Sequence, residues 1–320
     1  MDTSEQPTPA QSPAQENDRW KSAATPTLLS ATAAAASAGL LARRVPGWAL
    51  RSALWAGACG GLAVAANEVA GRPVPFLRWS FLRMMLGMRR LTRQWQVGDG
   101  REEAVAEYVA RNARRGDVDD VIRVIDEFCH RHSFLMNVGD EKGKILDAAV
   151  RRARPKRVLE LGTYCGYGSL RLARAAPDAR VHTVELVEAN AAIARRIHDH
   201  AGVGDRVEVV VGSVGDGGAT VERLGSLHGL SEGSLDLVFL DHDKDAYLPD
   251  LRRIEAQGWL RPGSVVVADN VRFPGAPQYR AFMREQEGRS WRTREHKTHV
   301  EYQTMLKDLV LESTYLGGRP

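Results

Sequence analysis

The sequence predicts an α/β domain built on a doubly wound, mostly parallel sheet and preceded by a helical or disordered leader. Two observations lead to this fold class. From about residue 157 onward, short β-rich runs alternate with helical windows, and the runs are continuously apolar. Strands of this kind, joined by crossover helices, are typical of a parallel sheet that is covered on both faces. Ligands of such sheets gather at the carboxyl ends of the strands.

The leader falls into three segments. Residues 1–26 are rich in Pro, Gln, Ser and Thr without apolar periodicity, so we expect a disordered tail. Residues 27–70 are rich in Ala and Gly and form a possible membrane anchor. Because Ala and Gly gain little on transfer to lipid, a loosely helical leader is the alternative. Residues 71–97 interleave arginines with aromatic residues, which suits a basic amphipathic linker helix at a lipid surface or an ordinary helix with a solvated basic face.

Charge and cysteine content limit the partners and the compartment. The first 100 of the 320 residues hold 11 basic and 6 acidic side chains, so the basic excess lies outside the predicted sheet. We therefore expect no nucleic-acid partner and, instead, membrane association through residues 27–95. Three widely spaced cysteines predict no disulfide framework. The protein is expected in the cytoplasm, or anchored to a membrane with its folded domain facing the cytosol.

The folded domain is expected to occupy residues 98–320. Apolar residues at helical spacing predict three helices before the first strand, near residues 105–109, 121–128 and 145–150. Five strands are predicted after them, at residues 157–161, 180–186, 207–211, 235–241 and 264–268. Weaker strand signals at residues 290–294 and 299–302 are candidates for an antiparallel edge of the sheet.

A glycine-rich turn follows the first predicted strand and leads into a helix. Its glycines are spaced GxxxGxG rather than GxGxxG, so it lacks the close pair that cradles a dinucleotide pyrophosphate. Close backbone approach at Gly162 and Gly166 instead suits a cofactor without phosphates. The second strand ends in Glu185, where a carboxylate can accept both hydroxyls of an adenosine ribose. Together these features point to S-adenosylmethionine, whereas Glu185 alone is equally a solvated acid at a strand end.

Oxygen-bearing side chains follow the fourth and fifth predicted strands. Asp241, Asp269 and Asn270 would lie on adjacent strand ends and offer three oxygens to one face of a Mg²⁺ ion, leaving positions for water and substrate. Taken singly, each is a solvated loop residue as readily as a metal ligand. Lys244 can reach the same cleft, where a divalent cation would lower its pKa. It is therefore a candidate general base, with a surface lysine as the alternative.

With these residues identified, the chain resembles the catechol O-methyltransferase family from about residue 98 to the C-terminus. The motifs that carry the resemblance occur in order at residues 136–140, 142–143, 160–167, 238–242, 244, 268–271 and 274–275. The resemblance implies a Rossmann-like class I methyltransferase with a seven-stranded sheet, S-adenosylmethionine as methyl donor and Mg²⁺ as cofactor. The apolar leader resembles the membrane-bound form of that enzyme and the related transmembrane O-methyltransferase.

The resemblance also assigns roles by position. The residues implied in cofactor binding are Val138, Glu160, Gly162, Tyr164, Gly166, Gly168, Glu185, Leu186, Ser213, Asp241 and His242. Those implied in holding Mg²⁺ are Asp241, Asp269 and Asn270. Those implied in binding the substrate are Phe134, Asp243, Lys244, Asn270, Pro274 and Glu301. Catalysis is implied for Lys244, which would take a proton from one catechol hydroxyl before its oxygen attacks the sulfonium methyl, and for Glu301, which would bond the second hydroxyl.

Three positions depart from the family pattern. Phe134 and Asp243 stand where the family typically has tryptophans around the catechol ring, so a wider and more acidic mouth is expected, with Pro274 kept as the third wall. Asp243 would admit larger or cationic substrates or simply point to solvent. Gly168 replaces a usual serine, which removes one hydroxyl contact to the cofactor and about one hydrogen bond of affinity.

These residues predict a Mg²⁺-dependent O-methyltransferase that moves a methyl group from S-adenosylmethionine to one hydroxyl of a catechol. One alternative is a membrane-tethered scaffold or trafficking protein that keeps the fold with little activity. A chain freed from catalysis would have no physical reason to retain three metal oxygens together with Lys244 and Glu301, so the enzyme is favoured. A second alternative is an O-methyltransferase of caffeoyl-type esters, which predicts the same metal and cofactor with a different acceptor.

Overall fold

The computed structural model describes residues 28–44, 47–70, 74, 77–86, 96–303 and 305–318. The tail predicted to be disordered, residues 1–26, lies outside the described residues, as does much of the predicted linker helix. The chain divides into two compact units. The first comprises residues 1–89 and 97–104, and the second comprises residues 90–96 and 105–320.

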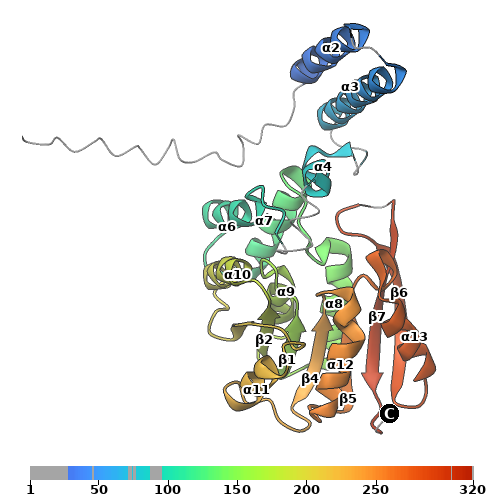
Figure 1. Ribbon diagram of the computed structural model, residues 1–320. Helices are drawn as coiled ribbons and strands as arrows, with labels where there is room; N and C mark the ends of the chain where they lie inside the picture. Colours follow the sequence, from blue (N-terminus) through green and yellow to red (C-terminus); the bar gives the residue numbers. More distant parts are fainter. Residues whose placement is uncertain are drawn as a thin grey trace, which may run out of the picture. The chain divides into compact units, whose positions relative to one another are not determined.

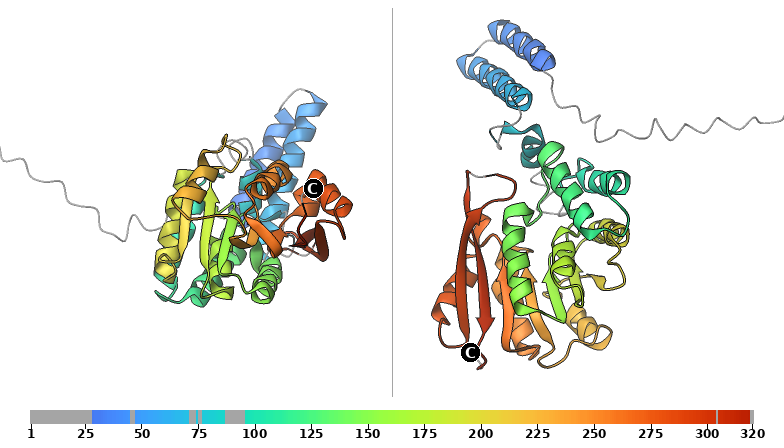
Figure 2. Two further views of the ribbon diagram at one scale, coloured as in Figure 1. Left: turned by 90° about the horizontal axis from the view of Figure 1, so that it is seen from below. Right: turned by 180° about the vertical axis from the view of Figure 1, so that it is seen from behind.

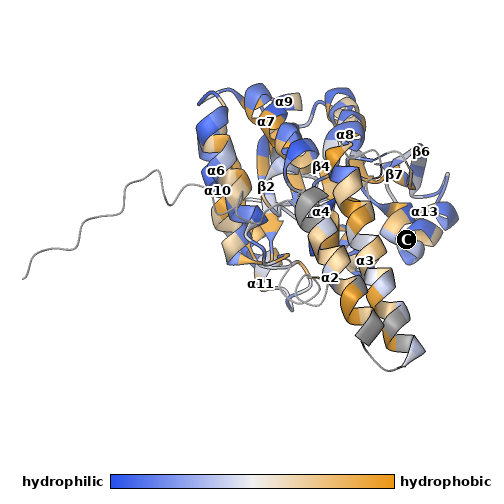
Figure 3. Ribbon diagram, turned by 90° about the horizontal axis from the view of Figure 1, so that it is seen from above, coloured by the Kyte–Doolittle hydropathy of each residue, from blue (hydrophilic) through white to orange (hydrophobic). Residues whose placement is uncertain are grey.

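The first unit contains three described helices. They are α2 (Leu28–Arg44), α3 (Trp48–Val69) and α4 (Trp79–Leu86). Helices α2 and α3 pack side by side and are coloured mainly orange and pale in Figure 3, as their Ala- and Gly-rich sequences require. Among the helices that the structure describes, none combines the length and the apolar character needed to cross a membrane. Within the predicted linker, α4 is the helix described, and association with a lipid surface stays a prediction.

The second unit is built on a seven-stranded sheet (Figure 1). Its strands are β1 (Arg157–Leu161), β2 (Arg180–Glu185), β3 (Val207–Val211), β4 (Leu235–Leu240), β5 (Leu260–Ala268), β6 (Trp291–His299) and β7 (Lys307–Tyr315). They lie in the order β3-β2-β1-β4-β5-β7-β6. The first five are parallel, whereas β7 runs antiparallel to both β5 and β6. The predicted mostly parallel, doubly wound sheet is confirmed.

Helices cover both faces of this sheet (Figure 2). On one face lie α8 (Gly139–Ala153), α9 (Tyr167–Ala175) and α10 (Glu188–Ala201), and α7 (Val118–Arg131) packs against α9 and α10. On the other face lie α11 (Ala219–Ser226), α12 (Tyr247–Ala256) and α13 (Pro277–Glu285). The remaining helix, α6 (Arg101–Asn112), belongs to both units. Apolar side chains of the central strands are almost completely buried between the two layers, which explains their continuous apolar runs.

The antiparallel edge differs from the sequence prediction. The strand expected at residues 290–294 is β6, but the one expected at residues 299–302 is wrong, because Glu301 and Tyr302 form a turn and Tyr302 has φ of 52°. The missing strand is β7, at Lys307–Tyr315. Strand β6 is mostly polar, with only two of its nine residues buried, so the apolar signal that marks the parallel strands is absent from this edge.

The register of the parallel strands aligns their carboxyl ends. Leu161 pairs with Val184 of β2 and with Leu240 of β4, and Leu240 pairs with Ala268 of β5. The residues that follow these pairs therefore lie next to one another along one edge of the sheet. This is the edge where ligands of open α/β sheets bind.

Candidate active site

The backbone holds the polar strand ends side by side. The amide of Gly162 donates to the carbonyl of Val184 at 3.0 Å, and the amide of Asp241 donates to that of Leu161 at 2.9 Å. The amide of Asp269 likewise donates to the carbonyl of Leu240 at 3.0 Å. The sheet bonding thus continues one residue beyond β1, β4 and β5. It brings together the glycine turn and two of the predicted metal ligands.

Two positions of the turn must be glycine because other atoms of the protein approach them closely. Gly162 has φ of 98°, and a Cβ there would lie 2.3 Å from the carbonyl oxygen of Asp241. Gly166, which precedes α9, has φ of 87°, and a Cβ there would lie 2.5 Å from Nε2 of His198. Any other residue would meet both backbone strain and a clash. The turn is therefore packed closely against Asp241 and His198, and cofactor binding by this turn stays a prediction.

Glu160 lies fully buried beneath this turn. Its Oε2 accepts a short hydrogen bond from the Ser169 hydroxyl, and its Oε1 has no hydrogen-bond partner among the described residues. Burial raises the pKa of Glu160 to about 8. A Cβ on Gly168 would lie 2.2 Å from Oε1, so the glycine that replaces the family's serine leaves room for this carboxyl group. A buried acceptor without a partner fits a cofactor that brings a donor or a positive charge.

Glu185 is fixed against the glycine turn by backbone donors. Its Oε2 accepts from the amide of Tyr164 at 2.8 Å, and its Oε1 accepts from the amide of Val187 at 2.9 Å and from the side chain of Asn190 at 3.4 Å. Burial raises the pKa of Glu185, and these donors oppose the shift. The carboxylate at the end of β2 is thus oriented before any ligand arrives.

The other residues predicted to bind the cofactor differ in their burial and in their contacts. Val138 is buried just before α8, Leu186 is 58% exposed just after β2, and Ser213 follows β3 in a turn where its hydroxyl accepts from the amide of Gly215 at 3.2 Å. His242 follows Asp241 and stacks on the ring of Tyr247 at 5.1 Å. The Nε2 of His242 lies 3.0 Å from Oδ2 of Asp250.

The predicted metal ligands lie in a cluster of opposite charges around one buried lysine. Lys142 of α8 is 1% exposed, and its Nζ lies 2.8 Å from Oδ2 of Asp269 and 3.2 Å from Oδ2 of Asp308. It also makes a short ion pair with Glu301. Burial alone would lower the pKa of Lys142, but the carboxylates around it outweigh burial and hold its pKa above the ordinary value.

Asp269 and Asn270 keep ligand atoms free within this cluster. Asp269 is fully buried, which raises its pKa, although Lys142 opposes the shift, and no hydrogen bond to its Oδ1 exists among the described residues. The side-chain nitrogen of Asn270 donates to Oε1 of Glu301 at 2.8 Å and to Oδ2 of Asp308 at 2.9 Å. Because the side-chain nitrogen of Asn270 is engaged by these two carboxylates, its side-chain oxygen is the atom available to a cation. This donor set fits Mg²⁺.

Lys244 joins the cluster from the other side. Its Nζ donates to Oδ1 of Asp241 at 3.1 Å and to the hydroxyl of Tyr247 at 2.7 Å. Tyr247 is fully buried, and its hydroxyl lies 2.7 Å from the carbonyl oxygen of Leu240 and 3.0 Å from that of Asp269. Lys244 itself is 16% exposed. It therefore lies between the buried cluster and solvent.

The residues predicted to form the substrate wall differ in exposure. The ring of Phe134 is nearly buried and meets that of Tyr302 edge-on at 6.5 Å. Pro274 is exposed in the short helix that follows Asn270. Asp243 is exposed, and its side chain accepts from the amide of Asp245 at 3.1 Å, which caps the turn that carries Lys244.

Three contributors were not assigned a role from the sequence. Lys142 belongs to one of the motifs that carry the resemblance, which is the signal that marked it. Asp308 and Tyr247 gave no signal, because one is an isolated acid at the start of β7 and the other an ordinary aromatic residue at a helix start. Their roles come from contacts across the fold.

Comparisons with known proteins show which chains this one is similar to. The O-methyltransferase family model matches residues 118–289. A probable O-methyltransferase of Mycobacterium tuberculosis is 64% identical over 234 residues, which cover 73% of this chain and 100% of that protein. Catechol O-methyltransferase B of Danio rerio is 44% identical over 218 residues, covering 68% of this chain and 80% of that protein. An O-methyltransferase of Streptomyces achromogenes, solved in complex with SAM, is 27% identical, with coverage of 55% and 80% and a TM-score of 0.45.

The fold and the site define a Rossmann-like methyltransferase, as the sequence predicted. The chain belongs to the O-methyltransferase family. This membership confirms the predicted class of an S-adenosylmethionine-dependent O-methyltransferase.

Proposed function

We propose that this protein transfers a methyl group from S-adenosylmethionine to one hydroxyl of a catechol and needs Mg²⁺ to do so. The observation that carries the proposal is the charge balance at the sheet edge. Four carboxyl groups face two ammonium groups there, and the six residues are Asp241, Asp269, Glu301, Asp308, Lys142 and Lys244. When all are ionised, the cluster carries two negative charges in excess. A divalent cation would balance them.

The residues that would hold Mg²⁺ are Asp241, Asp269 and Asn270. The ion, when bound, would polarise the vicinal oxygens of the substrate. Lys142 pairs with Oδ2 of Asp269, so Oδ1 of the same carboxylate is the atom available to a cation. Lys142 and Asn270 also hold Glu301 in position from two sides. The chain therefore orients its oxygens toward one point before the substrate binds, which is the preorganisation that catalysis requires.

Lys244 is proposed as the base. Its Nζ would accept the proton of the hydroxyl that is methylated, and the resulting ammonium is stabilised by Oδ1 of Asp241 and by the Tyr247 hydroxyl. Glu301 would accept a hydrogen bond from the second hydroxyl, which makes a pair of adjacent hydroxyls the feature that is recognised. The similarity to the catechol O-methyltransferase of Danio rerio supports the same substrate class.

S-adenosylmethionine would occupy the neighbouring half of the edge. Glu185, already oriented by backbone amides, would accept from the ribose, and the turn that contains Gly162 and Gly166 would line the methionine part of the cofactor. The unpartnered oxygen of Glu160 would face its positively charged end. Methyl donor and acceptor are thus brought to adjacent strand ends.

The test is methyl transfer by the full-length protein from labelled S-adenosylmethionine to a panel of catechols and a caffeoyl-type ester, with Mg²⁺ or with EDTA. Lys244→Met is compared with Lys156→Met, a surface lysine with 73% side-chain exposure. We expect a mono-methylated catechol as the product, formed with Mg²⁺ but not with EDTA. A loss of at least about 10²-fold in kcat is expected for Lys244→Met and none for Lys156→Met.

Three results would overturn parts of the proposal. Turnover in EDTA would exclude a requirement for Mg²⁺. Equal rates for the two lysine variants would exclude Lys244 as the general base. Turnover of the ester alone would exclude a catechol as the acceptor. A protein that binds S-adenosylmethionine, measured by calorimetry, but methylates no member of the panel would favour the scaffold alternative.

A further inference from the structure

A second group of potential metal ligands lies on the sheet away from the candidate active site. It consists of His182 in β2, Glu208 in β3 and His228 just after α11, and one ligand atom of each lies within 4.8 Å of the other two. His182 and Glu208 face each other as register partners across the two strands. His182 precedes Glu185 by three residues, which is about 10 Å along the strand from the edge that would bind the cofactor.

The fold fixes all three side chains on one face. Side chains alternate along a strand, so His182 shares its face with Val184, which is buried in the core together with Leu224 of α11. The loop that carries His228 is held at two points. The amide of His228 donates to the carbonyl of Arg223 at 3.3 Å, and Nη1 of Arg157 donates to the carbonyl of the next residue, Gly229, at 2.5 Å.

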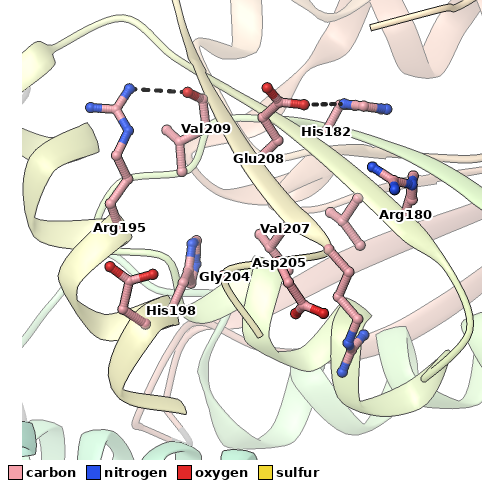
Figure 4. Close-up of a pocket in the computed structure, with 12 residues that line it drawn as sticks. Arg180, His182, Arg195, His198, Gly204, Asp205, Val207, Glu208 and Val209 are labelled. Carbon is pink, nitrogen blue, oxygen red and sulfur yellow. Dashed lines mark hydrogen bonds and ion pairs between the residues drawn. The ribbon is translucent and has the colours of Figure 1, made fainter. Parts of the chain in front are cut away.

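His182 has a buried nitrogen that points into this group. The residue is 4% exposed, and its Nδ1 has no hydrogen-bond partner among the described residues. That atom lies 3.5 Å from Oε2 of Glu208, as the dashed line in Figure 4 shows. The same carboxylate oxygen lies 2.9 Å from Nδ1 of His228. Three donor atoms therefore converge, and one of them is buried without satisfying its hydrogen-bonding capacity.

Burial and the neighbouring charges act on the pKa of His182. Burial lowers the pKa of His182, the neighbouring His228 lowers it further, and Glu208 opposes the shift. Arg157 and Arg180 act in the same direction as His228. Neutral imidazole is the form that binds metals.

We propose that His182, Glu208 and His228 form a binding site for a divalent transition-metal ion of the Zn²⁺ type. Two imidazole nitrogens and one carboxylate are an established donor set for zinc, with a fourth position left to water. Imidazole ligands favour such ions over Mg²⁺, which prefers oxygen. Ligand atoms of a tetrahedral site lie roughly 3.4 Å apart. Oε2 of Glu208 already lies 3.5 Å and 2.9 Å from the two imidazole nitrogens, so closure requires the imidazole of His228, which is 14% exposed, to move slightly toward that of His182.

The site would join three parts of the chain that are far apart in sequence. A bound ion would connect β2, the edge strand β3 and the loop between α11 and β4. None of the three ligands belongs to the proposed catalytic machinery. The expected role is therefore to stabilise this edge of the sheet, independently of whether methyl transfer occurs.

The test is titration of the full-length protein with Co²⁺, which reports imidazole coordination by visible absorption, in excess Mg²⁺ so that oxygen sites are filled. His228→Gln and Glu208→Gln are the variants, because both side chains are more exposed than His182 and the variants should fold. His296→Gln is the matched control, since His296 pairs with one carboxylate, Glu312, at 2.7 Å, and no second imidazole belongs to that pair. Circular dichroism checks the fold of each protein.

We expect one equivalent of Co²⁺ to give an absorption band that Zn²⁺ abolishes by displacement. Each of His228→Gln and Glu208→Gln should weaken Co²⁺ binding by at least about tenfold, whereas His296→Gln should leave it unchanged. Zn²⁺ should also raise the melting temperature of the parent protein and of the control, but not of the two variants. The absence of a band, or equal binding by all four proteins, would overturn the site, whatever the outcome of the methyl-transfer assay.

Discussion

The two halves of the candidate active site are built in different ways. The cofactor half is shaped by the backbone: glycines at positive φ let the turn pack closely against its neighbours, and backbone amides orient Glu185. The cation half is shaped by charge: Lys142 and Asn270 gather three carboxylates, which come from the end of β5, from the turn after β6 and from the start of β7. Local geometry therefore determines the first half and long-range electrostatics the second. Substitutions should affect the two halves in different ways.

The largest expected effect comes from removing the buried ammonium with Lys142→Met. This leaves Asp269, Glu301 and Asp308 without their shared cation, and breaking a buried ion pair typically costs about 3–5 kcal/mol of stability. Urea unfolding measures the loss, with Lys156→Met as the surface control. Because the excess negative charge increases, Mg²⁺ should raise the melting temperature of Lys142→Met more than that of the parent. A variant as stable as the parent would contradict a charge-built cluster.

The corresponding change in the cofactor half is Gly162→Ala. Its Cβ would meet both a φ of 98° and the Asp241 carbonyl at 2.3 Å, so we expect about 2–3 kcal/mol of destabilisation and a loss of S-adenosylmethionine binding by calorimetry. Gly217→Ala is the matched control, because Gly217 has φ of 82° but no heavy atom within 4 Å of an added Cβ. The control isolates backbone strain from the clash. Equal effects of the two substitutions on S-adenosylmethionine binding would show that the clash with the Asp241 carbonyl does not cause the loss of binding.

A pH effect should come from the same half through His198. Burial lowers the pKa of His198 to about 4, and its Nε2 lies 3.2 Å from the carbonyl oxygen of Gly166. Because the folded pKa lies below the unfolded value of about 6.5, the unfolded chain binds the proton first, and stability falls as the pH drops through this window. The loss at pH 5 should be about 2 kcal/mol.

To isolate the contribution of His198, the midpoint of urea unfolding is measured at pH 7 and at pH 5 for the parent and for His198→Gln. The variant should be less stable at pH 7 but should lose less stability on acidification. Identical slopes for the two proteins would assign the pH dependence to other groups.

The two halves also differ in how far the sequence predicts them. The parallel strands and the glycine turn follow from local patterns, and the strand ends then place Glu185, Asp241 and Asp269 together through sheet register alone. Strand β5 begins earlier than predicted, at Leu260, because Pro262 and Gly263 within it are typical of a loop. Strand β7 was missed, and Asp308 with it, since antiparallel pairing at a polar edge leaves little trace in local sequence.

Lys142 also shows why local sequence patterns do not predict the cation half. A lysine in a helix is ordinarily solvated, and the free energy of its burial depends on carboxylates that come from β6–β7 and from the end of β5. No pattern within α8 contains that information. The resemblance marked the motif, whereas the reason for Lys142 became evident from the structure.

The smallest expected effect concerns Asp243, which is predicted to lie at the mouth of the site. If the exposed carboxylate acts on substrates through charge, Asp243→Asn should lower kcat/KM for an amine-bearing catechol relative to a carboxylate-bearing catechol by about two- to fivefold, because one charge several ångströms away contributes up to about 1 kcal/mol in water. High salt should remove the difference. Asp245→Asn, an equally charged and exposed neighbour, is the control. A ratio that neither variant changes would mean that Asp243 serves the chain only by capping the turn that carries Lys244.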